Sequence, residues 1–219
     1  MLYYFYIYVL HLFSIKTPII NNIIYYIILY MICNLNNVND IIKSEGLDVL
    51  VISYGGCCSN TLVDYLEKNN FKCRTEIWGK ILCHCPEYIE CDIPIIYVYD
   101  NPIKSFLSMK NRGKGIWDIN QQKMSNDTNV VLSDKKLIEL MINQFNNWTN
   151  IKRSNVCVIK SCELFENNIV DKLEFFLKKK LYHFPIPYKT PQTNIESIKS
   201  IELFEKYKLE IDRINNFVI

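Results

Sequence analysis

Residues 47–66, LDVLVISYGGCCSNTLVDYL, decide the fold class of this chain. The first eight are apolar except for Asp48 and Ser53, which predicts a strand buried on both faces of a parallel sheet. A glycine pair then breaks the strand, and the Ser, Asn and Thr at 59–61 are helix N-cap types. Because apolar residues follow at helical spacing, the stretch predicts a strand, a glycine turn and a helix.

The first helical turn after such a glycine turn is a common place to hold phosphate. Its backbone N–H groups lack intrahelical partners, and the helix dipole adds about half a positive charge there. An ordinary tight turn uses glycine equally well, so both interpretations stay open at this point. No lysine follows the glycines, so the sequence lacks the Walker A pattern.

A second strand–turn–helix unit repeats this layout. Ile93–Tyr99 predicts a strand, 100–102 a turn, and Ile103–Lys110 a helix that is started by proline. Val156–Ile159 predicts a further buried strand. Two such units imply a parallel sheet. The sequence therefore predicts an α/β protein, a three-layer P-loop-type fold with a mostly parallel central sheet flanked by helices. A ligand crevice is expected at the C-terminal ends of the strands.

The other expected elements connect or follow these units. A helix capped by Ser133 presents the apolar face Leu137, Leu140, Met141, Phe145, Trp148 and Ile151. The rest are a short helix within 34–45, a short strand at 71–77, a loop at 111–128, a helix at 169–177 closed by 184–187, and a final helix at 198–214.

The composition indicates how many domains the chain forms and in which cellular compartment it lies. With 219 residues and a net charge of +2, the chain predicts one globular domain at 34–219 and no general affinity for nucleic acid. Nine cysteines without regular spacing indicate reduced thiols and a cytoplasmic protein. A zinc cluster within 73–91 is disfavoured because Cys83 and Cys85, in C-x-C spacing, reach one tetrahedral ion poorly. We therefore expect no metal site.

Residues 1–33 form a hydrophobic N-terminal extension. Polar residues such as Lys16 and Asn21 interrupt its two apolar runs, so neither reaches the ~20 residues of a membrane-spanning helix. Three interpretations stay open: a membrane anchor centred on 19–33, an unstructured extension, or translation that starts at Met31. We expect a cytoplasmic protein, with anchoring to a membrane as the alternative. A membrane is a partner only if residues 1–33 are a real anchor.

Four segments, in the same order and together spanning 47–181, resemble the sulfotransferase family, which uses 3′-phosphoadenosine 5′-phosphosulfate as its sulfonate donor. VISYGGCCSNTL resembles the family's 5′-phosphosulfate loop, S-Y-P-K-S-G-T-T. LCHCP resembles the K-T-H-L-P segment that carries the catalytic histidine. IIYVYDNPIKSFLSMKNRG resembles the 3′-phosphate segment, I-Y-V-x-R-N-P-x-D-x-x-x-S. Trp148 with NVCVIKSCELFEN resembles the W…V-L-V-L-x-Y-E-D-L run.

This resemblance implies a role for each matched position. His84 falls at the general base, and a histidine can accept a hydroxyl proton near neutral pH. Ser108 falls at the serine that contacts the 3′-phosphate. Arg112, in the basic cluster that follows it, is a further candidate cofactor contact. The 5′-phosphosulfate would be cradled by Gly55, Gly56, Cys57, Cys58, Ser59, Asn60 and Thr61. We will call residues 55–61 the cradle loop.

The sequence departs from the family pattern where cofactor charge is neutralised. Gly56 or Cys57 stands in place of a lysine or arginine, and Asp100 stands in place of the arginine that contacts the 3′-phosphate. The family's C-terminal glycine- and lysine-rich loop is not recognisable. Four basic residues are candidates for compensation: Lys104, Lys110, Arg112 and Lys114. The alternative is that they form a solvated basic loop.

The expected function is a divergent sulfotransferase, in which a small-molecule or macromolecular hydroxyl acceptor loses its proton to His84 and attacks sulfur. The alternative is a catalytically inactive sulfotransferase-like scaffold that binds a nucleotide or a partner. Phosphoryl transfer, as in a small kinase, is disfavoured because the sequence shows no Walker A lysine and no convincing magnesium carboxylate. A thiol nucleophile at Cys57 or Cys58 is disfavoured because no histidine or carboxylate stands beside it in the sequence.

Overall fold

The computed structural model describes residues 38–74, 82–111, 133–150, 152–182 and 202–217. They belong to one compact unit, Asn36–Ile219, and a second unit, Met1–Leu35, lies outside the described residues. The predictions for 1–33, Arg112 and 184–187 therefore concern residues that the structure does not describe. Within the described part of the chain, no helix is both long enough and apolar enough to cross a membrane.

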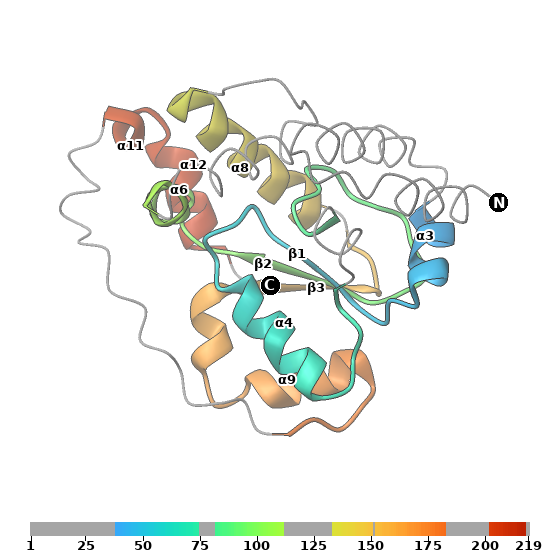
Figure 1. Cartoon of the computed structure of the whole chain (residues 1–219). Coiled ribbons are helices and arrows are strands. Elements are labelled where there is room, and N and C mark those ends of the chain that lie inside the picture. The colour runs from blue at the N-terminus through green and yellow to red at the C-terminus, as the bar shows by residue number, and fades with distance from the viewer. Residues whose placement is uncertain (1–37, 75–81, 112–132, 151, 183–201, 218–219) are drawn as a thin grey trace. The chain divides into compact units, whose positions relative to one another are not determined.

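Within the described residues, the sheet has three parallel strands, in the order β1 (Leu50–Ile52), β2 (Ile95–Tyr99), β3 (Val156–Lys160) (Figure 1). Every residue of β1 and β2 is buried, as expected for strands that are covered on both faces. This confirms an α/β protein with a parallel sheet.

Each of the first two strands runs into a helix. α4 (Ser59–Lys68) follows β1, and α6 (Pro102–Lys110) follows β2. Proline stands at the first position of α6, and the side-chain oxygen of Asn101 caps it by accepting from the N–H groups of Ile103 (2.9 Å) and Lys104 (3.1 Å). The predicted second strand–turn–helix unit is therefore confirmed.

α8 (Asp134–Thr149) is the longest described helix and packs on the sheet. Ser133 caps it by accepting from the N–H of Lys136 (3.3 Å), as its sequence predicts. The Trp148 ring stacks on Tyr97 of β2, with the centroids 5.8 Å apart. In Figure 1, α8 lies on one side of the sheet, and α4 and α9 (Ile169–Leu177) lie on the other.

The remaining described elements are α3 (Val38–Glu45), the 3₁₀ helix η2 (Ser161–Phe165), α11 (Glu202–Lys206) and α12 (Lys208–Asn215). The described part of the final helix predicted at 198–214, residues 202–214, therefore forms two helices with Tyr207 between them. Of the strand predicted at 71–77, the described residues 71–74 are not a strand.

β1 is shorter than the predicted strand of residues 47–54. The N–H of Ser53 donates to the carbonyl of Cys83 (2.8 Å), a residue outside the sheet. The chain therefore leaves the ladder after Ile52 and turns toward the segment that carries His84.

Candidate functional site

The cradle loop follows β1, includes the first residues of α4 and rests against the first turn of α6. Gly55 and Gly56 have φ of +91° and +70°, values that residues with a side chain rarely adopt. A Cβ on Gly56 would lie 2.6 Å from the carbonyl oxygen of Ser105, so no side chain fits at this position. The lysine or arginine of the sulfotransferase pattern therefore cannot stand at position 56 in this loop conformation.

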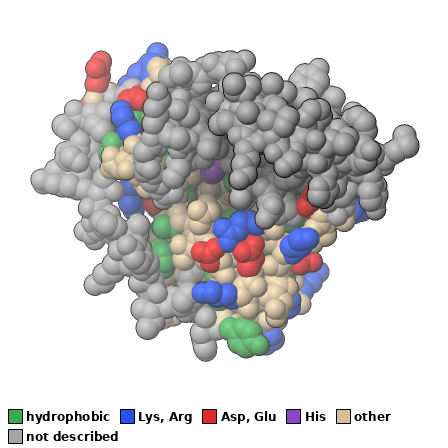
Figure 2. Space-filling model, viewed as in Figure 1, with side chains coloured by type: hydrophobic (Ala, Val, Ile, Leu, Met, Phe, Trp, Pro, Cys, Tyr) green, Lys and Arg blue, Asp and Glu red, His purple; other side chains and the backbone are tan. Residues whose placement is uncertain are grey.

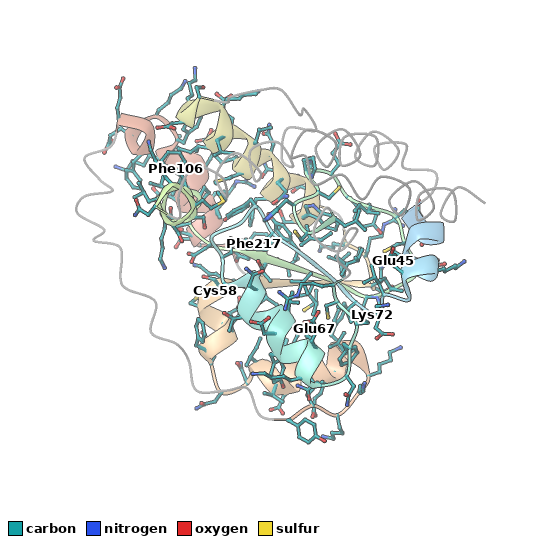
Figure 3. The ribbon with its side chains drawn as sticks, in the orientation of Figure 1. Glu45, Cys58, Glu67, Lys72, Phe106 and Phe217 are labelled. Atoms are coloured by element: carbon teal, nitrogen blue, oxygen red, sulfur yellow. The ribbon has the colours of Figure 1, made fainter. Side chains whose placement is uncertain are left out.

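The first turn of α4 supplies backbone donors at the end of the cradle loop. Cys58, at the N-terminal end of α4 (Figure 3), accepts from the N–H of Thr61 (3.0 Å). Among the described residues, no group accepts from the N–H of Ser59 or Asn60. Ser59 Oγ accepts from Ser53 Oγ at 3.0 Å, which ties this turn to the end of β1. Two N–H donors at a helix N-terminus suit an anion.

Cys57 lies beneath the loop as a buried thiol. Its Sγ–H donates to the carbonyl of Gly55 (3.0 Å), and Sγ lies 3.4 Å from the hydroxyl oxygen of Ser105. Burial raises the pKa of the Cys57 thiol well above its usual value, and the charge of Asp100 raises it further. Cys57 is therefore protonated at neutral pH, which argues against a thiolate nucleophile at this position.

His84 lies beside the end of β1, next to the cradle loop. Its Nδ1 is 2.7 Å from the carbonyl oxygen of Ser53, two residues before Gly55. A carbonyl can only accept, so Nδ1 must carry the proton in this contact. In the neutral ring the other nitrogen, Nε2, then has a free lone pair and can act as a base.

Side chains of α8 hold the turn that carries His84. Gln144 Nε2 donates to the carbonyl oxygens of His84 (3.1 Å) and Cys85 (2.8 Å), and Trp148 Nε1 donates to Cys85 (3.1 Å). Gln144 was not predicted as a site residue. The available signal is its position seven residues after Leu137, on the apolar face of a helix, where a polar residue is unusual.

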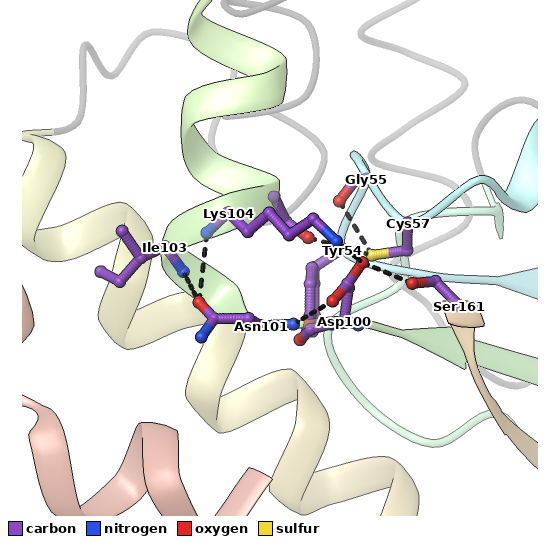
Figure 4. A network of polar contacts seen from close by, with 9 residues as sticks. Tyr54, Gly55, Cys57, Asp100, Asn101, Ile103, Lys104 and Ser161 are labelled. Atoms are coloured by element: carbon purple, nitrogen blue, oxygen red, sulfur yellow. Dashed lines mark hydrogen bonds and ion pairs between the residues drawn. The ribbon is translucent and has the colours of Figure 1, made fainter. Parts of the chain in front are cut away.

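Asp100 follows β2 and is the centre of a polar network (Figure 4). Its Oδ2 accepts from the hydroxyl of Ser161 and lies 3.4 Å from Lys104 Nζ, and its Oδ1 accepts from the N–H of Asn101 (2.7 Å). Tyr54, which follows β1, accepts from the N–H of Asp100 through its hydroxyl (2.9 Å). Residues that follow all three strands thus meet at the C-terminal edge of the sheet, where ligands of α/β proteins bind.

Lys104 is the cation nearest to the cradle loop among the predicted compensating residues that the structure describes. Its side chain extends from α6 toward Tyr54 and Cys57 (Figure 4). Lys110 instead pairs with Asp134 at the start of α8 (2.7 Å). The ion pair between Lys104 and Asp100 could be predicted from the sequence, because opposite charges four residues apart lie close together at the start of a helix.

Ser108 lies one helical turn farther along α6 than Ser105, the residue that touches the cradle loop. Residues three apart share a helix face, so Ser108 lies on the side of α6 that faces the loop, about 5 Å farther along the axis. Its side chain is partly buried. Arg112 is outside the described residues. The structure thus brings His84 and the cradle loop together and leaves Ser108 one turn away.

The exposed surface of α4 mixes both signs of charge. Arg74 pairs with Asp64 and with Glu67 (2.9 Å). On the face shown in Figure 2, basic and acidic side chains likewise lie side by side. Positive charge on this face is therefore offset by neighbouring carboxylates.

The described residues contain no group of three or more His, Cys, Asp or Glu side chains that could hold a metal ion. The eight cysteines in the described part of the chain are all free thiols. No family model, curated protein or solved structure matches this chain.

Proposed function

We propose that this chain is a divergent sulfotransferase with a three-layer P-loop-type fold. It would transfer sulfonate from 3′-phosphoadenosine 5′-phosphosulfate to a hydroxyl acceptor. The observation that carries the proposal is the 2.7 Å contact between His84 Nδ1 and the carbonyl of Ser53. This contact leaves Nε2 basic and places the ring beside the loop whose N–H groups suit a 5′-phosphosulfate.

The donor supplies a sulfonate that is already activated by its bond to phosphate. His84 Nε2 takes the proton of the acceptor hydroxyl, whose oxygen then attacks sulfur while the bond from sulfur to the 5′-phosphate oxygen breaks. The N–H groups of Ser59 and Asn60 hold the phosphate as it gains negative charge, and they need no reorganisation to do so. The residues present therefore fit the 5′ end of the donor.

Lys104 replaces the missing loop cation in this proposal. Gly56 cannot carry a side chain, and the Cys57 side chain is buried beneath the loop. Lys104 approaches from α6 and is partly exposed, so its ammonium group can turn from Asp100 toward a bound anion.

A second candidate is the catalytically inactive scaffold, and Asp100 favours it. A carboxylate fixed at the end of β2 by Ser161 repels a phosphate, at a cost on the order of 1 kcal/mol at a solvated surface. In that case the fold binds a partner or a nucleotide without a 3′-phosphate.

The test is a sulfonate-transfer assay with the full chain and a panel of alcohols, phenols and saccharides. We expect His84→Ala to lower turnover by at least about 100-fold, the usual effect of losing a general base. Lys136→Ala, at an exposed position in the first turn of α8, is the control and should retain activity. Equal turnover of wild type and His84→Ala would remove His84 as the base. A folded wild-type chain that transfers nothing would favour the scaffold.

A further inference from the structure

Gln144 is a polar residue kept inside the core at a cost. It is 0% exposed and lies on the buried face of α8 with Met141 and Phe145. Its Oε1 is buried and has no hydrogen-bond partner among the described residues. A buried acceptor without a partner is unfavourable, so an apolar side chain would be the more stable choice for packing alone.

The amide nitrogen of Gln144 explains why a glutamine stands at this position. Gln144 Nε2 donates to two successive carbonyls, those of His84 and Cys85. At the residue before His84, the N–H of Ser53 donates to the carbonyl of Cys83. The main chain around His84 is thus held from α8 and from the end of β1 at once, and only the imidazole ring is left to orient.

We infer that Gln144 is a positioning residue that sets the tautomer and the direction of His84. By fixing the main chain of the turn, it holds the ring where Nδ1 donates to the Ser53 carbonyl, and it thereby leaves Nε2 as the basic nitrogen. This inference rests on the proposed role of His84 as the base.

Gln144→Met separates a positioning role from a structural one. Methionine has a similar length and volume, removes the unpaired acceptor and fills the same space. The lost hydrogen bonds and the removed penalty offset each other, so the variant should fold. The His84 turn, however, loses both hydrogen bonds from Gln144, including the one to the carbonyl of His84 itself, and keeps those from Trp148 Nε1 to Cys85 and from the Ser53 N–H to Cys83.

The experiment measures the tautomer of His84 in the full chain by long-range ¹H–¹⁵N NMR, with His84→Asn to assign the signals. Wild type should show the Nδ1–H form. In Gln144→Met the tautomer ratio should move about fivefold to tenfold toward that of an unconstrained histidine, as expected when the hydrogen bond from His84 Nδ1 to the Ser53 carbonyl is no longer held in place. Asn147→Ala is the matched control: Asn147 donates to the carbonyl of Pro86 (3.0 Å) from an exposed position, and its loss should leave the ratio unchanged.

An unchanged ratio in a folded Gln144→Met would overturn the inference, as would the Nε2–H form in wild type. Gln144→Leu is the second variant, and loss of folding in both variants would likewise overturn it, because Gln144 would then be a structural residue. The tautomer is measured without donor or acceptor, so this result is independent of whether sulfonate transfer occurs.

Discussion

At the scale of single residues, Asp100 and Lys104 decide the charge that a bound anion meets. They lie 3.4 Å apart and offset each other, so the edge of the sheet is close to neutral at this point. A ligand phosphate must draw Lys104 away from Asp100 and tolerate the carboxylate that is left behind. The two residues therefore act on anion binding with opposite signs.

Substitutions at these two positions should change affinity for 3′-phosphoadenosine 5′-phosphate in opposite directions. Lys104→Gln should weaken binding about fivefold to tenfold, and Asp100→Asn should strengthen it by a similar factor, because one removes attraction and the other repulsion. Isothermal titration calorimetry at low salt measures both, and added salt should shrink both effects.

Lys110→Gln is the control for this pair, since Lys110 lies on the same helix and pairs with Asp134 instead. It should bind the ligand as wild type does. Equal losses in Lys104→Gln and Lys110→Gln would mean that general basicity, and not the position of Lys104, sets the affinity.

At the scale of elements, the contact between the cradle loop and α6 fixes the shape of the site. Gly56→Ala should destabilise the protein by about 2–4 kcal/mol, because it adds a clash with the Ser105 carbonyl to the cost of a positive φ. Chemical denaturation measures the loss.

Gly46→Ala is the matched control for this contact. Gly46 also has a positive φ (+61°), but its added Cβ would meet only Lys72 Nζ at 3.9 Å. The free energy of unfolding should therefore fall by about 1–2 kcal/mol, which is the cost of the positive φ alone. If both variants lost the same stability, the close approach of loop and helix would be refuted.

The elements themselves could be read from local sequence patterns. The parallel sheet follows from two repeated units, and the helix starts at Pro102 and Ser133 follow from N-terminal preferences. The prediction was wrong at two element boundaries. The N–H of Ser53 donates to Cys83 and does not continue β1, and the last predicted helix divides at Tyr207 within the described residues.

The candidate site could be predicted only in part. The resemblance named His84 and the cradle loop, but the hydrogen bond that joins His84 to Ser53, two residues before the loop, spans 31 residues and has no periodic signal. The contact of Gln144 with His84 spans 60 residues. Such long-range contacts depend on how helices pack on the sheet, which spacing along the chain does not encode.

At the scale of the whole molecule, buried thiols couple stability to pH. Burial raises the pKa of Cys91 and of Cys157 to about 11, and that of Cys73 to about 12. Unfolding returns each thiol to its ordinary pKa near 8.5–9, so the folded state binds more protons than the unfolded state between pH 9 and 11. Stability should be unaffected by these groups below pH 8 and should fall above pH 9.

Urea denaturation under reducing conditions tests this dependence. Between pH 8 and pH 10 the free energy of unfolding should drop by about 1 kcal/mol for each of these thiols. A variant with Cys91→Val and Cys157→Val should lose about 2 kcal/mol less over the same range. A free energy that stays constant, or rises, over this interval would contradict the burial of these thiols.

The central claim is that the C-terminal edge of the sheet holds the sulfonate donor. Titration of the full chain with 3′-phosphoadenosine 5′-phosphate, the expected product, tests it most directly by calorimetry at low salt. We predict binding with a Kd on the order of micromolar, and a weaker Kd in Ser108→Ala, because hydrogen bonds to a charged phosphate are among the stronger ones. A well-folded chain that binds none of this ligand would contradict the proposed function.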